Sequence, residues 1–417
     1  MQNNDRIYKN VYKITFFLVL SMPIALLLRS GITNLTAIML SITILASIYS
    51  LRVKEIFKDK LIIYLLIFFL YIFINSIINF HSFEIILKSL GNFRYILISV
   101  GVYLVLSTIT EKQKEKIVNL NLILILIICF DIIYQYIFYK DLLGFLPGIC
   151  PSGIAQGCQR FSGPFGDELV AGGYLSQIGL LFLFLHRSIN LKERIYKISL
   201  INIYLLALFL VIIITGERNA LLIYLIAISF IFLFQKKLFH LILILSFLLS
   251  ILFIASQIFG SVNKRFTSIL KVINQTDVDR EHLYLQETNL DFFQKIKESP
   301  WGNHYQAAFE LFEDSIIFGQ GPKSFRIKCG TTEIEKIQVK KEKQDGEGSH
   351  YFACSSHPHN YLLEFLSENG ILGGLFYVGF ILLIVVRIIK KRKNKMVDDV
   401  LKSIALGWSK FIFVLSS

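Results

Sequence analysis

The amino-acid sequence predicts an all-α polytopic membrane protein with about 11 transmembrane helices and one large loop subdomain. Of its 417 residues, 54% are hydrophobic and only 18% are charged, whereas soluble domains are about 25% charged. The mean hydropathy is +0.59. The apolar residues gather in runs of about 20, the length that an α-helix needs to cross the hydrocarbon layer. The composition therefore indicates a membrane protein rather than a large soluble core.

Ten apolar runs are interpreted as transmembrane spans, and an eleventh begins near residue 400 and is expected to be incomplete at Ser417. Each span must be helical, because a lone strand would leave backbone groups unsatisfied in lipid. The first run is interpreted as an anchor and not a signal peptide, because it is long and lacks a small-residue cleavage site. The ten runs are 11–29, 34–50, 61–80, 93–109, 117–138, 171–186, 198–215, 219–235, 238–258 and 371–389.

Three regions follow from these spans. Residues 1–258 hold the first nine helices, with a short outer loop at 139–170. Residues 259–358 form the large outer loop, in which the segment "HYQAAFELFEDS" has helical apolar spacing and ends before "GQGP". Residues 359–417 hold the last spans.

Lys and Arg in the connections predict the orientation. They are dense in every second connection, so that side is expected to be cytoplasmic, together with the N-terminus. The formal net charge of +13 is interpreted as a topology signal, and no nucleic-acid partner is inferred from it. The dense connections hold Arg6, Lys9, Lys13, Arg52, Lys54, Lys58, Lys60, Lys112, Lys114, Lys116, Arg187, Lys192, Arg194, Lys197, Lys236 and Lys237, and the stretch "RIIKKRKNK".

The five cysteines predict an oxidising outer compartment. Cys129 lies within a span, where it is a small apolar residue. The other four lie in the two outer loops, and we expect the bridges Cys150–Cys158 and Cys329–Cys354. The alternative is free or metal-bound thiols, although no CxxC spacing supports a zinc site.

The stretch "SSHPHNYLLEFL" places two histidines before the last complete span. Pro358 disfavours helix at His357, so the helix is expected to begin near His359 or Asn360. A histidine at a helix N-terminus is favoured in its neutral form by the helix dipole. Neutral His359 is thus a candidate general base, and His357 is assigned a positioning role. The alternative is a histidine that only anchors the membrane interface.

The stretch "TGERNALL" places Glu217 and Arg218 between two spans with almost no loop. An arginine so close to hydrocarbon is costly unless it is paired or faces a wet cavity. A guanidinium binds phosphate oxygens through two parallel hydrogen bonds, so Arg218 is a candidate anion-binding residue. A Glu217–Arg218 interfacial pair is the alternative.

Two glycine-containing segments carry further cations. Arg160 lies in "CQRFSGPFGDELVAGG", and Lys323 and Arg326 lie in "IIFGQGPKSFR". Glycine permits close backbone approach to a ligand, although it also simply makes turns. No GxxxxGK[ST] pattern accompanies these glycines, so a P-loop is not predicted.

Taken together, these motifs resemble a known family. His359-Asn360, nine residues, Gly370, two residues and Gly373 are similar to the HNx9GxxG signature of the O-antigen ligase and polymerase superfamily. Arg218 and Leu222 resemble the Arg-x3-Leu motif of that family, and the order of spans, arginine motif, large loop and histidine motif also agrees.

The resemblance implies a GT-C-like glycosyltransferase of the bacterial inner (cytoplasmic) membrane with a periplasmic active site and no metal or cofactor. Arg218 and His359 would be its catalytic residues. Its donor would be an undecaprenyl-pyrophosphate-linked glycan and its acceptor lipid A-core or another glycan, within membrane lipid. Residues expected to bind the pyrophosphate or glycan are Arg160, Arg326, Lys323, His357, Asn360 and Glu217.

Alternatives remain at this point. A second essential arginine of the family belongs to the large loop and is one of Arg265, Arg280 and Arg326. Ligase activity is favoured, and a polymerase that extends the polyprenyl-linked chain is the main alternative. A transporter or flippase would place charges deep within spans, and only Asp131 and Arg94 approach that pattern.

Overall fold

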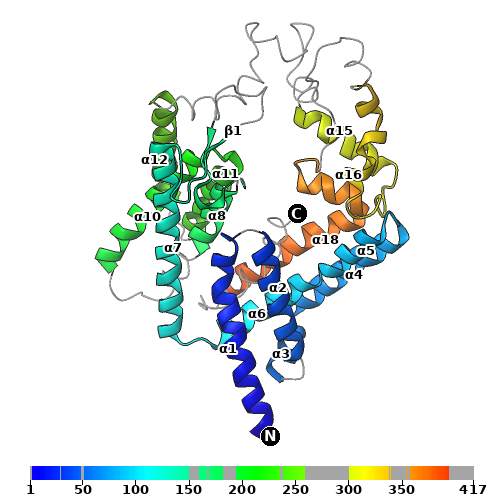
Figure 1. Ribbon diagram of the computed structural model, residues 1–417, viewed down its shortest axis with the longest axis horizontal. Coiled ribbons are helices and arrows are strands. Elements are labelled where there is room, and N and C mark those ends of the chain that lie inside the picture. Colours follow the sequence, from blue (N-terminus) through cyan, green and yellow to red (C-terminus); the bar gives the residue numbers. More distant parts are fainter. Residues whose placement is uncertain are drawn as a thin grey trace. The chain divides into compact units, whose positions relative to one another are not determined.

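The protein is described here by a computed structural model, which is almost wholly helical and divides into two compact units (Figure 1). Unit 1 comprises Met1–Val19, Asn34–Thr108 and Val272–Ser417, and unit 2 comprises Leu20–Thr33 and Ile109–Lys271. The structure describes residues 2–28, 30–47, 51–149, 159–166, 168, 170–181, 194–234, 238–258, 300–337, 339, 354 and 357–393.

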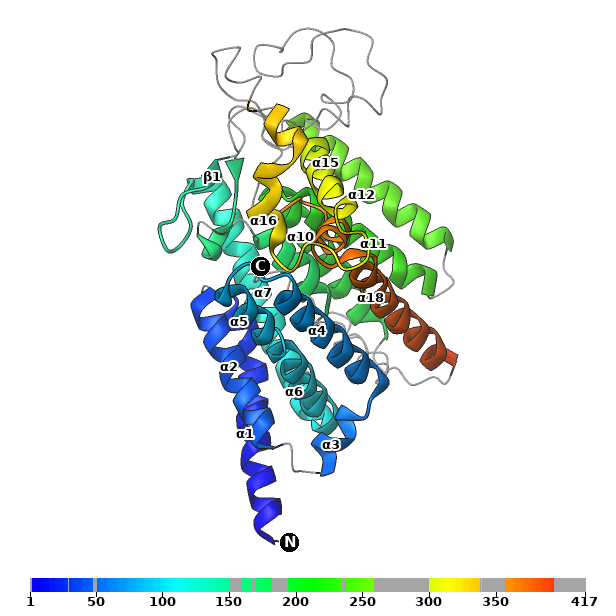
Figure 2. The same cartoon turned by 90° about the vertical axis from the view of Figure 1, so that its right-hand side faces the viewer.

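In unit 1, the transmembrane helix α4 (Lys60–Ile78) packs against α5 (Phe83–Gly91), α6 (Arg94–Thr108) and α18 (Tyr361–Lys393) (Figure 2). Local sequence sets the helix ends, because Asp59 caps α4 at Leu61 N and Ser82 caps α5 at Ile85 N. The helices of the outer-loop region are α15 (Pro300–Glu313), α16 (Ser324–Lys328) and the short η4 (Cys329–Thr331). Helix α3 (Leu51–Phe57) packs on α6, while α1 (Gln2–Ala25) and α2 (Ser30–Ala46) contribute to both units.

Unit 2 is built around α7 (Glu111–Phe138), which begins with a capping box formed by Thr110 and Gln113. A two-stranded antiparallel ribbon, β1 (Gly148–Ile149) and β2 (Gln159–Arg160), follows it. The remaining elements are η1 (Gly163–Phe165), α8 (Ala171–Tyr174), the π-helical turn η2 (Leu175–Gly179), α10 (Arg194–Thr215), α11 (Arg218–Phe234) and α12 (Leu238–Ile258).

The expected class of helical membrane protein is confirmed, and the number of about 11 spans stays a prediction. Five described stretches are long and apolar enough to cross a membrane: Lys60–Ile78, Phe83–Thr108, Glu115–Phe138, Leu238–Gln257 and Tyr361–Arg387. Four further apolar helices are shorter. The expected run at 171–186 begins with α8 and a π-helical turn, not regular α-helix. The eleventh segment and the boundary at 258–259 lie outside or beside the described residues.

Helix α18 is broken at Gly370, and the segment between α15 and α16 fills the break. Gly370 has a left-handed φ of 63°, so the hydrogen-bond ladder is interrupted within a candidate span. The segment restores the lost bonds: Gln320 N donates to Ser367 O (2.9 Å), Gly321 N to Glu368 O (2.8 Å) and Ile371 N to Ile316 O (2.8 Å). In lipid such a break is tolerated only where other protein groups satisfy the backbone.

Buried polar side chains of α4 complete this junction. The Asn75 amide, which is 2% exposed, donates to Phe318 O (3.0 Å) and Glu368 O (3.1 Å). Tyr71 Oη donates to Asn369 O (2.5 Å). An asparagine inside an apolar helix is costly unless it is hydrogen-bonded. The carbonyl groups at the break satisfy the Asn75 amide, and the amide in turn stabilises the broken helix.

Contacts at the two ends of α4 show which connecting segments of unit 1 lie at the same end of its helices. At one end Arg387 of α18 forms a two-bond ion pair with Asp59 (2.6 and 2.7 Å). At the other end His81 Nε2 lies 2.7 Å from the carbonyl oxygen of Gln320. The stretch before α4 and the end of α18 therefore share one end, as the alternation of basic residues predicts, whereas which end is cytoplasmic stays a prediction.

We predict that Gly370→Ala destabilises the protein. A Cβ at this position would overlap the Ile317 carbonyl group, and a left-handed alanine adds strain of about 1–3 kcal/mol. The thermal midpoint of the purified protein in detergent should fall well below that of the wild type. The control is Gly330→Ala, where a Cβ meets nothing within 4 Å. Equal midpoints for Gly370→Ala and the wild type would show that the break is not under this constraint.

Candidate functional site

The predicted site residues that the structure describes form two groups, one in each unit. Unit 2 brings together Arg160, Glu217 and Arg218. Unit 1 brings together His357, His359 and Asn360, with Lys323 and Arg326 beside them. Arg265, Arg280, Cys150 and Cys158 lie outside the described residues.

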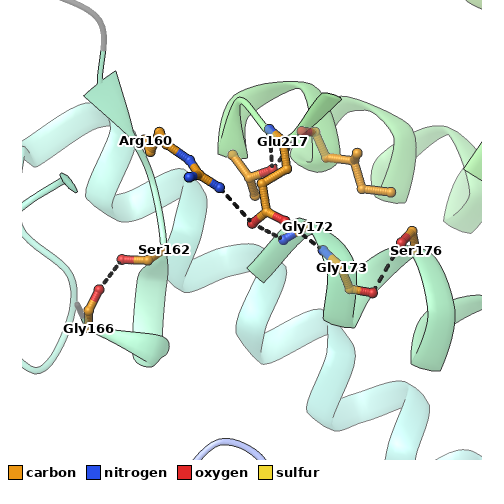
Figure 3. A network of polar contacts seen from close by, with 9 residues as sticks. Arg160, Ser162, Gly166, Gly172, Gly173, Ser176 and Glu217 are labelled. Atoms are coloured by element: carbon orange, nitrogen blue, oxygen red, sulfur yellow. Dashed lines mark hydrogen bonds and ion pairs between the residues drawn. The ribbon is translucent and has the colours of Figure 1, made fainter. Parts of the chain in front are cut away.

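Glu217 is the centre of the unit 2 group (Figure 3). Its carboxylate accepts hydrogen bonds from Gly172 N (2.9 Å) and Gly173 N (3.1 Å) in the first turn of α8. The backbone of Gly172 lies close to the end of α10, because a Cβ on Gly172 would lie 2.6 Å from Thr215 Oγ1. The glycines of "VAGGYL" thus bring two backbone N–H donors to the Glu217 carboxylate. The alternative in which these glycines only make a turn does not account for these hydrogen bonds.

Arg160 reaches Glu217 from the ribbon. Its Nη2 lies 3.8 Å from Glu217 Oε1, and both side chains are largely buried. Strand β2 fixes this position, since Arg160 pairs with Gly148 of β1. The sequence suggested Arg218 as the partner of Glu217. The structure shows that Glu217 faces Arg160, which is 57 positions away in the chain.

Arg218 begins α11 and lies near Arg160. Burial lowers the pKa of Arg218, and the positive charge of Arg160 lowers it further. The pKa of Arg160 is also lowered by burial, while Glu217 raises it. Both guanidinium groups stay charged at neutral pH, since the ordinary pKa exceeds 12. Two neighbouring half-buried cations, one of them beside the Glu217 carboxylate, favour an anion as a further partner.

A disulfide holds the chain before the histidines of unit 1. Cys329 and Cys354 are bonded, with their Cα atoms 5.0 Å apart, which is the pairing expected from the sequence. Cys329 belongs to a small buried core with Ala307, Leu311 and Phe325. Cys354 N also donates to Glu335 Oε2 (2.8 Å). The chain thus leaves α15 and α16 from a fixed point three residues before His357.

Three imidazole rings lie together at the start of α18. The ring centroids of His357 and His359 are 4.3 Å apart, and those of His359 and His304 are 5.3 Å apart. The helix begins at Tyr361, slightly later than expected, and His359 precedes it with a left-handed φ of 54°. Asn360 is the capping residue, because its Oδ1 accepts hydrogen bonds from Leu362 N (3.1 Å) and Leu363 N (3.2 Å).

The neutral state expected for His359 has a different cause from the helix dipole. Burial lowers the pKa of His359 to about 4, and the charges of His357 and His304 add to the effect. Burial also lowers the pKa of His357, with contributions from Arg326 and His304. Because His359 is exposed to solvent by its accessible surface, we expect its protonation to affect stability only modestly.

Lys323 and Arg326 lie close to the carboxylates of Glu364 and Glu368, two residues that were not predicted as part of the site. Burial lowers the pKa of Lys323, Arg326 lowers it further, and Glu368 and Glu364 oppose the effect. The Glu368 carboxylate accepts hydrogen bonds from the backbone N–H groups of Lys323 and Phe325. The spacing of four residues between Glu364 and Glu368 was a readable signal that both lie on one face of α18.

His304 was also missed. It lies in the helix expected from "HYQAAFELFEDS", where the sequence offers apolar spacing but nothing that links it to His359, 55 positions later. As for a metal, the described part of the chain contains no cluster of three or more His, Cys, Asp or Glu side chains that could hold an ion. Metal independence stays a prediction.

These features define a multi-pass helical membrane protein with one group of buried arginines and one of clustered histidines. Residues 203–378 match the family model described as O-antigen ligase. Residues 203–378 are thus similar to the O-antigen ligase domain, and this match supports a function of the ligase or polymerase type in general. The matched region includes Arg218, His359, Gly370 and Gly373. No curated protein and no solved structure gives a significant match.

We predict that acid destabilises the protein partly through His359. Its pKa falls from the ordinary 6.5 to about 4 in the folded state, so the unfolded chain binds an extra proton between these values. Stability from this group is complete above pH 6.5 and is lost as the pH falls toward 4. Thermal midpoints measured between pH 4 and 7 should fall less steeply for His359→Gln than for the wild type.

The control for this experiment is His240→Gln, which removes an exposed imidazole from α12. Its midpoint should follow the pH dependence of the wild type. A wild-type slope in His359→Gln would show that the His359 ring is not held neutral by its surroundings.

Proposed function

We propose that the protein transfers a glycan from a polyprenyl-pyrophosphate donor to a hydroxyl of a lipid or glycan acceptor, at the periplasmic face of the inner membrane. The observation that carries the proposal is that the matched O-antigen ligase region contains both Arg218, half-buried next to a second arginine, and His359, held neutral among other imidazoles. We assign Arg218 to the leaving group and His359 to the acceptor.

The leaving group needs positive charge more than it needs an acid. When the bond between the anomeric carbon and the pyrophosphate oxygen breaks, the electron pair stays with the pyrophosphate, whose own pKa is low. Fixed guanidinium groups stabilise this charge as it develops. Arg218 supplies two parallel hydrogen bonds, and Arg160 supplies a second cation that Glu217 holds in place.

The acceptor hydroxyl needs a base. In the proposed step its oxygen attacks the anomeric carbon and inverts it, while its proton passes to a ring nitrogen of His359. A pKa of about 4 keeps the ring unprotonated at neutral pH but makes it a weak base.

The acceptor distinguishes the ligase from the polymerase. We favour the ligase, whose acceptor is lipid A-core or a similar lipid-linked glycan. Surface glycans of a deletion strain provide the test. Loss of all capped lipid supports a ligase, and capping by a single repeat unit supports a polymerase.

We predict that Arg218→Lys does not restore the activity lost in Arg218→Ala, because a single ammonium cannot reproduce two parallel contacts. His359→Ala should lose about 10²–10⁴-fold in rate while donor binding survives, and His357→Ala should lose less. The measurement is transfer from a defined polyprenyl-pyrophosphate donor by purified variants at matched amounts.

The control is Lys336→Ala, which removes an exposed cation from the large-loop region. This variant should transfer glycan at the wild-type rate. A double variant, Arg218→Ala with His359→Ala, adds a further test. If both residues serve one step, their effects should not add. Near-wild-type turnover in His359→Ala would remove the histidine from the mechanism.

We also predict that chelators leave transfer unchanged, since arginines alone can neutralise the leaving pyrophosphate. The rate should be equal with and without EDTA for enzyme purified without added metal. Loss of activity in EDTA, with recovery on adding one divalent ion, would contradict this mechanism.

A further inference from the structure

Unit 1 contains a pocket of about 690 Å³ whose lining includes Lys323 and Arg326, the cations beside the histidine group. Helices α5, α6, α16 and α18 contribute most of its wall. Along α18 the lining extends from Tyr361 to Ile384, so the pocket follows most of the candidate span Tyr361–Arg387. Its volume lies in the usual range for a site that binds a small molecule or cofactor.

The first residue of α6, Arg94, lines this pocket. It belongs to the candidate span Phe83–Thr108, where an ionisable residue generally marks a functional site. Its Nη2 donates to Tyr95 Oη (3.0 Å), and its guanidinium lies 5.0 Å from the Tyr95 ring centre. Its Nε is buried without a hydrogen-bond partner among the described residues.

The other near-span charge of the sequence has a structural role. Asp131 on α7 accepts a hydrogen bond from Leu142 N (2.8 Å) and so fixes the turn that follows its own helix. Of these two charges, Arg94 is thus the one with unused hydrogen-bonding capacity in the described part of the chain.

The remaining charges of the lining have partners. Lys88 is ion-paired with Glu84. Glu368 accepts two backbone hydrogen bonds, and Glu364 lies in the field of Lys323 and Arg326. The lining carries four basic residues (Lys88, Arg94, Lys323 and Arg326) and three acidic ones (Glu84, Glu364 and Glu368). Among the four basic residues, Arg94 is the one with a buried nitrogen that has no hydrogen-bond partner among the described residues.

The lining beyond Arg94 is apolar. Ile72 of α4 and Phe380, Ile381 and Ile384 of α18 contribute to it. These α18 residues lie after the break at Gly370, whereas Glu364 and Glu368 lie before it. A cationic end followed by an apolar length is complementary to an amphiphile with an anionic head.

We propose that this pocket binds a phosphate-bearing membrane lipid, with Arg94 contacting the phosphate and the apolar lining of α4 and α18 contacting the hydrocarbon chain. The site belongs to unit 1 and shares Lys323 and Arg326 with the residues expected to bind the pyrophosphate or glycan. Two sources share the required chemistry, an anionic phospholipid and a polyprenyl phosphate.

The test is lipid binding by the purified full chain, measured by native mass spectrometry in detergent. The probes are phosphatidylglycerol, undecaprenyl phosphate and the zwitterionic phosphatidylcholine. At least one anionic lipid should bind the wild type in preference to phosphatidylcholine. Arg94→Gln should weaken that binding about 10- to 100-fold, the usual worth of a hydrogen bond to a charged group, and Arg94→Lys should weaken it less.

Matched variants separate this site from general charge effects. Lys336→Gln removes the same charge from an exposed position outside the pocket and should bind as the wild type does. Ile381→Trp should weaken binding of the long-chain lipid but not of its dihexanoyl analogue, since Ile381 belongs to the apolar lining. Thermal midpoints confirm that each variant is folded.

The two anionic probes identify the source of the ligand. Tighter Arg94-dependent binding of phosphatidylglycerol indicates a bulk phospholipid, and tighter binding of undecaprenyl phosphate indicates a polyprenyl lipid. Binding that is equal in Arg94→Gln and the wild type would overturn the proposal, as would absence of any preference for anionic lipid. Because no transfer is measured, either failure leaves the proposed function untouched.

Discussion

The contact between Gly319 and Gly370 supports much of unit 1. The two backbones approach so closely that a Cβ on either residue would overlap main-chain atoms of the other segment. This approach lets the amide groups of Gln320 and Gly321 reach the carbonyl groups that α18 leaves open. Without these bonds, a broken helix at membrane depth would leave several backbone groups unsatisfied, each costing several kcal/mol. The charged and histidine-bearing segments on either side are positioned by this junction.

The same junction gives a physical reason for both glycines of the histidine motif. Gly370 adopts the left-handed conformation at the break. Gly373 leaves room for Asn369, whose side chain a Cβ there would overlap. Asn369 in turn accepts hydrogen bonds from Asn75 and Tyr71 of α4. The glycine spacing that resembles the family signature therefore follows from a helix break and its packing. The histidine at the start of the motif is the proposed general base.

Two of the ion pairs among the described residues join charges at the ends of helices or strands. Glu217 joins an arginine of the ribbon to the first turn of α8, and Asp59 joins the start of α4 to the end of α18. Such partially buried pairs contribute to specificity of packing as much as to stability. Arg218 in unit 2 and Arg94 in unit 1 are the residues on which the two proposals rest.

The sequence alone was sufficient for features that depend on neighbouring residues. Apolar length located the candidate spans, and the loop position of the cysteines predicted the bond between Cys329 and Cys354. Only the tertiary structure decided which distant groups meet: Arg160 with Glu217, His304 with His359, and Asn75 with the break in α18. The reason is that periodicity and caps are local properties of the chain. A hydrogen bond between residues 45 to 293 positions apart is set by packing, which no local pattern records.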